Sequence, residues 1–207
     1  VLARIDSLSE SRDRELILTG IASQLQKLGE GRAALYLHNE SVRLALETGN
    51  PTTITFALLR RCITNQKLGN ISAASADLGS AREHANRFPD QKVSNLFQYE
   101  FSILEADNLL SENPAESIRL YTRVISYFSK LNNHYYRIRL YRSRALAYLA
   151  LGDTARAESD LKEGINEIER NRKLVVDSRQ RMEFFEITES LYEDLISLLM
   201  QNGRKAE

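Results

Sequence analysis

Cysteine, proline and long apolar runs are scarce in this 207-residue sequence, and each scarcity excludes something. The lone cysteine, Cys62, excludes an intramolecular disulfide and fits a reducing compartment, so we expect a cytoplasmic protein. No apolar run approaches the ~18 residues needed to cross a bilayer, so we expect no membrane association. Pro51, Pro89 and Pro114 each lie at the edge of an apolar-periodic segment, where proline can begin or end a helix. Because the sequence starts at Val1 rather than at methionine, we expect it to be a piece of a longer protein.

The charges balance, with 28 lysines and arginines against 28 aspartates and glutamates, so the formal net charge is zero. Proteins that bind nucleic acids usually carry a basic excess, so this balance argues against a nucleic-acid partner without excluding a local basic patch. No segment shows the sustained alternation of apolar and polar residues that is typical of a half-buried strand. The sequence therefore predicts an all-α fold.

A motif recurs along the chain at intervals of about 40 residues. It reads "QKLGEGRAAL" at 26–35, "QKLGNISAAS" at 66–75 and "LALGDTARAE" at 149–158. A degenerate copy, "LLSENPAESI" at 109–118, fills the gap between the second and the third, with Glu112 in the place of the glycine. A partial copy, "LLMQNGRKAE", occupies 198–207. Each copy joins the apolar end of one helix, through a short polar turn, to small residues that begin the next.

This motif predicts a helical hairpin, whose first helix we call helix A and whose second we call helix B. A glycine can take the left-handed conformation that ends helix A, and the short turn sends helix B back antiparallel. Small residues early in helix B let the two helices approach closely: Ala34, Ala74, Ser117 and Ala157. Four positions further on, a large apolar residue is expected to pack between the hairpins: Leu78, Tyr121 and Leu161. His38 is the exception in the first copy. One hairpin cannot bury its apolar face alone, but a stack of hairpins can.

The pattern resembles a tetratricopeptide-repeat (TPR) array over about residues 10–172. In that family a small residue lies in the middle of helix A, as Ala22, Cys62 and Ala145 do here, although Glu105 stands there in the degenerate copy. The period is longer than the usual ~34 residues, which is similar to the extended repeats of kinesin light chains and bacterial signalling proteins. The resemblance implies a right-handed α-solenoid, a single domain over 1–207 with units at about 13–49, 52–88, 92–131 and 134–172 and a partial fifth at 178–207.

The C-terminal segment carries a second resemblance. Its long helix is similar to the last repeat before a CHAT domain, a caspase-like protease domain that follows bacterial TPR arrays. This resemblance implies that the chain is the sensing arm of a bacterial signalling protein, with the catalytic part in a downstream domain of the same chain. The residues that match the pattern are Arg181, Phe184, Phe185, Tyr192, Leu195, Ile196, Leu198 and Leu199.

Four arginines, at positions 137, 139, 142 and 144, crowd the predicted helix that ends before Gly152. At 100° per residue, Arg137 and Arg144 share one side of this helix, whereas Arg139 and Arg142 lie on another, so they form no single basic stripe. In TPR arrays the second and fifth positions of helix A face the concave groove, and the count gives Arg139 and Arg142. Applied to the second and third units, the count adds Leu59 and Ser102. The residues predicted to line a partner-binding groove are Phe56, Arg60, Gln66, Tyr99, Arg139 and Arg142.

Arginine forks bind carboxylates, so this groove is expected to take a peptide or helix of acidic character. The competing interpretation is that these arginines are solvated or paired with neighbours such as Glu105 or Asp160.

Cys62 fits a buried core position better than a nucleophile, and His38, His84 and His134 show no metal-ligand spacing. Since no cofactor or catalytic motif is present either, we expect a non-enzymatic interaction scaffold without a cofactor. The alternatives are a free-standing TPR adaptor or regulator arm that binds a peptide and, from another class, an RNA-binding helical array.

Overall fold

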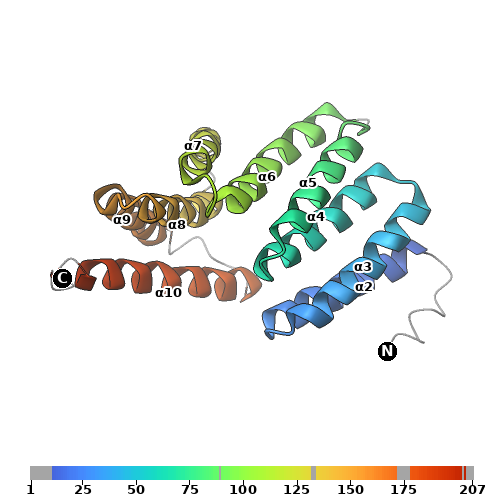
Figure 1. Ribbon diagram of the computed structural model, residues 1–207, viewed down its shortest axis with the longest axis horizontal. Coiled ribbons are helices and arrows are strands. Elements are labelled where there is room, and N and C mark those ends of the chain that lie inside the picture. Colours follow the sequence, from blue (N-terminus) through green and yellow to red (C-terminus); the bar gives the residue numbers. More distant parts are fainter. Residues whose placement is uncertain (1–10, 89, 132–133, 172–177, 202, 204–207) are drawn as a thin grey trace. The chain divides into compact units, whose positions relative to one another are not determined.

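The computed structural model describes residues 11–88, 90–131, 134–171, 178–201 and 203. Outside this description lie Pro89, residues 132–133 and 172–177 near the predicted boundaries between hairpins, and the side chains of His134, Arg181 and Phe184. The described residues form α-helices joined by turns, without a strand, as predicted (Figure 1). In chain order the helices are α2 (Ser11–Lys27), α3 (Gly31–Thr48), α4 (Pro51–Lys67), α5 (Ile71–Ala85), α6 (Gln91–Leu109), α7 (Pro114–Lys130), α8 (His134–Ala150), α9 (Thr154–Asn171) and α10 (Ser178–Gln201).

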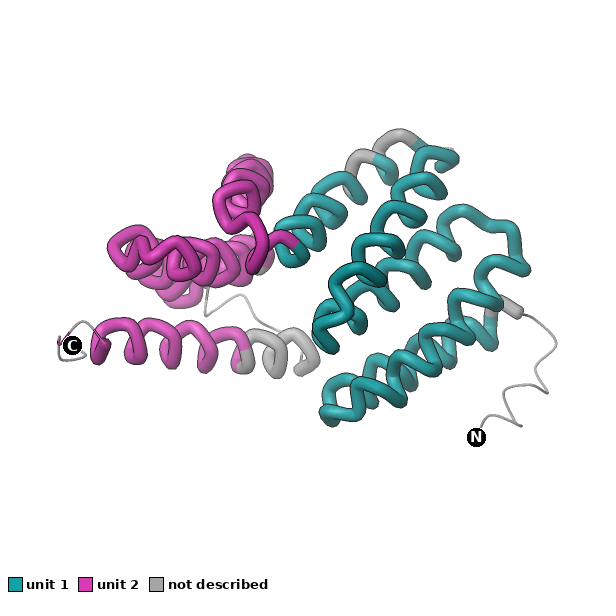
Figure 2. The backbone as a smooth tube through the Cα atoms, viewed as in Figure 1, with its two compact units in different colours: residues 1–108 teal, residues 109–207 magenta. Residues whose placement is uncertain are grey.

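The chain divides into two compact units, Val1–Asn108 and Leu109–Glu207, which Figure 2 colours separately. Unit 1 contains α2 to α5 and nearly all of α6, and unit 2 contains α7 to α10. Within unit 1, α2 packs against α3 and α4 against α5, and within unit 2, α8 packs against α9. The single array predicted over residues 1–207 stays a prediction.

Three of the turns between helix A and helix B have the same backbone hydrogen bonds, because a glycine occupies the same place in each. Gly29, Gly69 and Gly152 have φ values of 82°, 74° and 74°, in the left-handed region that favours glycine. After α2, the Glu30 N–H donates to the carbonyl of Leu25 over 2.9 Å, the outer bond of a Schellman motif. The same bond joins Asn70 to Asn65 and Asp153 to Tyr148. The recurring Leu-Gly pair therefore ends helix A as predicted.

Asparagine and proline begin two of the helices. The Asn50 side chain accepts hydrogen bonds from the N–H groups of Thr52 and Thr53, and Pro51 stands in the first turn of α4. Asn113 caps α7 in the same way by accepting from the Glu116 N–H, with Pro114 in the first turn. Proline is tolerated there because the first-turn N–H groups have no partner inside the helix. The degenerate turn around Glu112 thus starts its helix B without a glycine.

The hairpin cores form where small residues of helix A and helix B meet. Ala22 and Ala34 belong to one apolar cluster, Cys62 and Ala74 to a second, and Ala145 and Ala157 to a third. All six side chains are fully buried, which brings the two helix axes of each hairpin close together. The larger residues four positions further on in helix B are buried as well: His38, Leu78, Tyr121 and Leu161.

Glutamines connect successive A helices of unit 1. Gln26 of α2 donates to Thr64 Oγ1 of α4 over 3.1 Å. Gln66, its counterpart one repeat later, donates to the Leu104 carbonyl of α6 over 2.8 Å and to Asn108 Oδ1 over 3.0 Å. The repeated sequence therefore repeats a cross-link, in which Gln26 and Gln66 each join one A helix to the next.

An arginine–aspartate pair joins helix A to helix B in two of the hairpins. Arg61 binds Asp77 with both arms of its guanidinium, and Arg144 binds Asp160 with Nε and Nη2 at 2.7 Å each. A further bond from each arginine reaches the preceding helix B, at Asn39 and at Thr122. In the first and third copies of the motif, apolar side chains stand at the corresponding positions: Ile21 with Leu37, and Leu104 with Leu120.

Candidate binding pocket between α2 and α4

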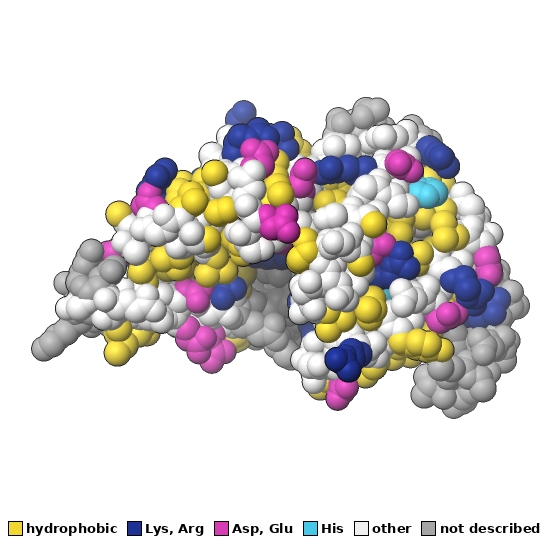
Figure 3. Space-filling view, in the orientation of Figure 1, with side chains coloured by type: hydrophobic (Ala, Val, Ile, Leu, Met, Phe, Trp, Pro, Cys, Tyr) yellow, Lys and Arg dark blue, Asp and Glu magenta, His cyan; other side chains and the backbone are white. Residues whose placement is uncertain are grey.

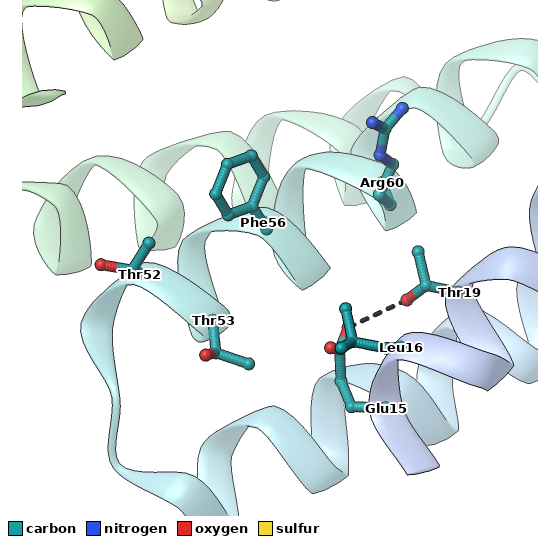
Figure 4. A pocket seen from close by; sticks show the side chains of 7 residues that line it. All are labelled: Glu15, Leu16, Thr19, Thr52, Thr53, Phe56 and Arg60. Atoms are coloured by element: carbon teal, nitrogen blue, oxygen red, sulfur yellow. Dashed lines mark hydrogen bonds between the residues drawn. The ribbon is translucent and has the colours of Figure 1, made fainter. Parts of the chain in front are cut away.

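A pocket of about 360 Å³ lies in unit 1 between the A helices α2 and α4 (Figure 4). Residues four apart on a helix share a face, which explains how each wall is built. From α2, Glu15 and Thr19 line the pocket, with Leu16 beside them. The remaining lining residues come from α4: Thr52, Thr53, Phe56 and Arg60. The pocket therefore combines two charged side chains of opposite sign, three hydroxyls and two large apolar side chains.

Phe56 and Leu16 give the pocket its apolar character. They are 48% and 57% exposed, which is high for side chains of this size. Phe56 is nevertheless held in place, because its ring meets that of Phe97 in an edge-to-face contact with centroids 5.0 Å apart. The exposed ring is thus an ordered surface supported by α6.

The two charged residues of the pocket differ sharply in burial. Glu15 is only 4% exposed, and its Oε1 accepts hydrogen bonds from Thr19 Oγ1 and Ser41 Oγ, each over 2.9 Å. Arg60 is exposed, and its guanidinium forms no hydrogen bond or ion pair among the described residues. The pocket therefore offers one shielded anion and one accessible cation.

The six residues predicted for the groove have different surroundings in the structure. Phe56 and Arg60 line the pocket, whereas the amide of Gln66 is bound to α6. Arg142 donates from Nε to Asp194 Oδ2 of α10 over 2.7 Å. Tyr99 is half-buried in α6 and Arg139 is exposed on α8.

The count of helix A positions back from the turn also selected Leu59 and Ser102, and both are buried. Leu59, at 5% exposure, lies in the core, and Ser102 donates to the Gln98 carbonyl.

Several arginines of α8 bind carboxylates of the neighbouring helices in unit 2. Arg137 donates to Glu167 over 2.8 Å and Arg144 to Asp160, so both reach α9 from the side of α8 that they were predicted to share. Arg142 faces α10. On the face drawn in Figure 3, lysines and arginines are scattered among acidic and apolar side chains rather than gathered in one strip. Pairing within the fold, the competing interpretation of these arginines, is what the structure shows for Arg137, Arg142 and Arg144.

Two further candidates for chemistry, Cys62 and His38, are buried. Cys62 is fully buried, and burial, followed by the charges of Asp77 and Asp107, raises the pKa of its thiol to about 12. His38 is 1% exposed, and burial, followed by Arg60 and Arg61, lowers its pKa to about 4. Among the residues that the structure describes, no three metal-ligating side chains come together. None of the described helices is long and apolar enough to cross a membrane.

Sequence reasoning missed five lining residues: Glu15, Leu16, Thr19, Thr52 and Thr53. A signal for two of them was present. The count that gives Phe56 in the second hairpin gives Leu16 and Thr19 when it starts from Gly29 in the first. No such signal marks Glu15, because its burial depends on Ser41, which lies 26 residues away in α3.

Comparisons with known proteins agree with the fold. No family model matches the sequence, and no curated protein matches it. Among solved structures, the chain is similar to a tetratricopeptide repeat protein from Parabacteroides merdae, with 23% identity and a TM-score of 0.52. The similarity covers 90% of this chain and 71% of that one. The chain therefore has an all-α, solenoid-type fold of TPR-like hairpins, as predicted.

Proposed function

We propose that this chain is a non-catalytic protein-interaction module that binds a peptide segment along the A helices of unit 1. The observation that carries the proposal is the pocket between α2 and α4, where the exposed Leu16 and Phe56 lie beside Arg60, whose guanidinium pairs with none of the described residues. Grouped large apolar side chains with polar neighbours are typical of interaction sites, whereas isolated ones are common on any surface. An ordered aromatic ring also costs little conformational entropy on binding, which makes Phe56 the expected anchor.

The acidic character expected of the partner has less support than the groove itself. Arg142 is occupied by Asp194, so its guanidinium is not available without breaking that pair. Arg60 is accessible and can bind a carboxylate of the partner at the rim of the pocket. We therefore assign the acidic contact to Arg60.

The experiment compares two alanine substitutions of aromatic side chains, one inside the pocket and one outside it. Peptides are selected on the 207-residue chain from a random dodecapeptide library, and their affinities are measured by fluorescence anisotropy. Phe56→Ala should weaken binding about tenfold or more, as expected for an aromatic anchor. Tyr36→Ala, which removes an exposed aromatic ring from α3, should leave the affinity unchanged. The proposal would be contradicted if the two substitutions changed the peptide affinity equally, or if neither changed it.

We also propose that the module is the sensing arm of a larger bacterial signalling protein of the cytoplasm with a CHAT-type protease domain downstream. The support is the resemblance of the last helix to the repeat that precedes such domains. In addition, α10 exposes Phe185, Tyr192, Ile196 and Met200, an apolar surface suited to a neighbouring domain. The test is the parent gene beyond the codon for Glu207. A caspase-like α/β pattern with a histidine and a later cysteine is expected, and further helical repeats or a stop codon would leave a free-standing adaptor.

A further inference from the structure

Glu15 is a buried carboxylate that forms no ion pair with a described residue. It is 4% exposed, and the donors that reach it are two hydroxyls, Thr19 Oγ1 and Ser41 Oγ, both on Oε1. Among the described residues, none donates a hydrogen bond to its second oxygen, Oε2, and no lysine, arginine or histidine forms an ion pair with it. Figure 4 shows the carboxylate beside Thr19 and the Arg60 guanidinium turned away from it.

An arrangement of this kind is costly for the protein by itself. A carboxylate removed from water loses hydration that two neutral hydroxyls on one oxygen replace only in part. A cationic donor that arrives from outside gains a charge-assisted hydrogen bond to the vacant oxygen. The carboxylate therefore favours a ligand with a positively charged group, although the chain as a whole is neutral.

The walls of the pocket restrict the shape of such a ligand. Leu16 and Phe56 offer apolar surface beside the carboxylate, and the hydroxyls of Thr19, Thr52 and Thr53 can accept further hydrogen bonds. A buried carboxylate at the wall of a pocket of about 360 Å³ is reached best by a long, thin group with an apolar stem and a charged end. Lysine and arginine side chains have this form, and the lysine ammonium carries three donors.

We propose that the partner peptide inserts a lysine or arginine side chain into this pocket, where its charged end donates to Glu15 Oε2 and its stem packs against Leu16 and Phe56. This inference rests on the proposed function, because it names the side chain that the interaction module recognises. The partner then carries mixed charge, with a basic side chain at Glu15 and an acidic one at Arg60. A purely acidic peptide would leave Glu15 unpaired and would be repelled by it.

The test uses the random dodecapeptide library on the full 207-residue chain, with Glu15→Gln as the variant. Glutamine keeps the shape of the side chain and an oxygen that Thr19 and Ser41 can reach, but it removes the charge. We expect the peptides selected on the wild type to share one basic position. Changing that residue to glutamine should weaken binding about tenfold or more on the wild type and have little effect on the Glu15→Gln variant. The change on the peptide side needs no protein variant, so a variant that failed to fold would not prevent the test.

The outcomes separate this inference from the proposed function. Selected peptides that depend on Phe56 but share no basic residue, or that bind Glu15→Gln as well as the wild type, would overturn the inference and leave the interaction module standing. Selected peptides that do not depend on Phe56 would overturn both. The paired losses, with an interaction between the peptide residue and Glu15 in the double-mutant cycle, would establish the contact.

Discussion

The replacement of His38 by leucine should stabilise the protein, and more so in mild acid. His38 lies in α3 at a position where two other hairpins have Leu78 and Leu161, and it is 1% exposed. Its Nδ1 is buried without a hydrogen-bond partner among the described residues. Burial, followed by the positive charges of Arg60 and Arg61 on α4, lowers its pKa from 6.5 to about 4. Leucine fits the same repeat position without a polar atom to leave unsatisfied.

The size of the pH effect follows from the two pKa values. The imidazole has a lower pKa in the folded protein than in the unfolded chain, so the unfolded chain binds more protons between pH 6.5 and about 4. The unfolding free energy therefore falls as the pH drops through this window, and the protein keeps its full stability above pH 6.5. Each pKa unit is worth about 1.4 kcal/mol, which gives a loss of about 2 kcal/mol by pH 5 and about 3 kcal/mol below pH 4.

The assay is urea unfolding at pH 7.5, 6 and 5, followed by circular dichroism for the wild type and His38→Leu. Carboxylates titrate in both proteins, so the difference between the two isolates the histidine. We expect His38→Leu to be more stable already at pH 7.5, because a buried unsatisfied nitrogen costs about 1 to 3 kcal/mol. Its advantage should grow by about 2 kcal/mol at pH 5. A constant difference between pH 7.5 and 5 would refute the assignment of a buried neutral imidazole.

Three further predictions concern the repeat. Arg144→Leu or Asp160→Leu alone should lower the unfolding free energy by about 3 kcal/mol, because each leaves a buried charge without its partner, whereas the double change should cost far less. Urea unfolding of the three variants checks this, and additive losses would contradict it. Gly69→Ala should cost about 1 kcal/mol through backbone strain at a φ of 74°, while Gly79→Ala within α5 should stabilise by a similar amount, and thermal unfolding must separate the two. The Cys62 thiol, whose pKa is raised to about 12, should react with a disulfide reagent at pH 8 only after unfolding in urea, and rapid reaction of the native protein would show that it is accessible.

The hairpin turns could be predicted from the sequence because their causes are local. The left-handed conformation of Gly69 and the hydrogen bonds around it depend on residues within one turn of a helix. The same locality explains why Arg137 and Arg144 were placed on one side of α8, since 100° per residue fixes their relative direction. Phe56 was found for a related reason, because its distance from the turn gives its place in the register of α4, although the same count also selected the buried Leu59.

The engagement of side chains with distant partners could not be predicted in this way. Gln66 was expected to face a partner, but its amide binds Leu104 and Asn108 in the next A helix. Arg142 was expected in the groove, but Asp194 stands opposite it, 52 residues later in the sequence. Helical periodicity gives the direction of a side chain from its own axis and does not identify the helix that lies in that direction.

The sequence by itself determined the helices, their turns and the small residues at which each hairpin closes. These features depend on backbone conformation and side-chain volume within single repeats, as with Gly152 and Ala157. Only the tertiary structure decided which polar groups are used up and which stay available, because that depends on packing between helices distant in sequence. Packing buries Glu15 beside Ser41 and leaves Arg60 unpaired within the described part of the chain, and so forms a pocket that no single segment encodes.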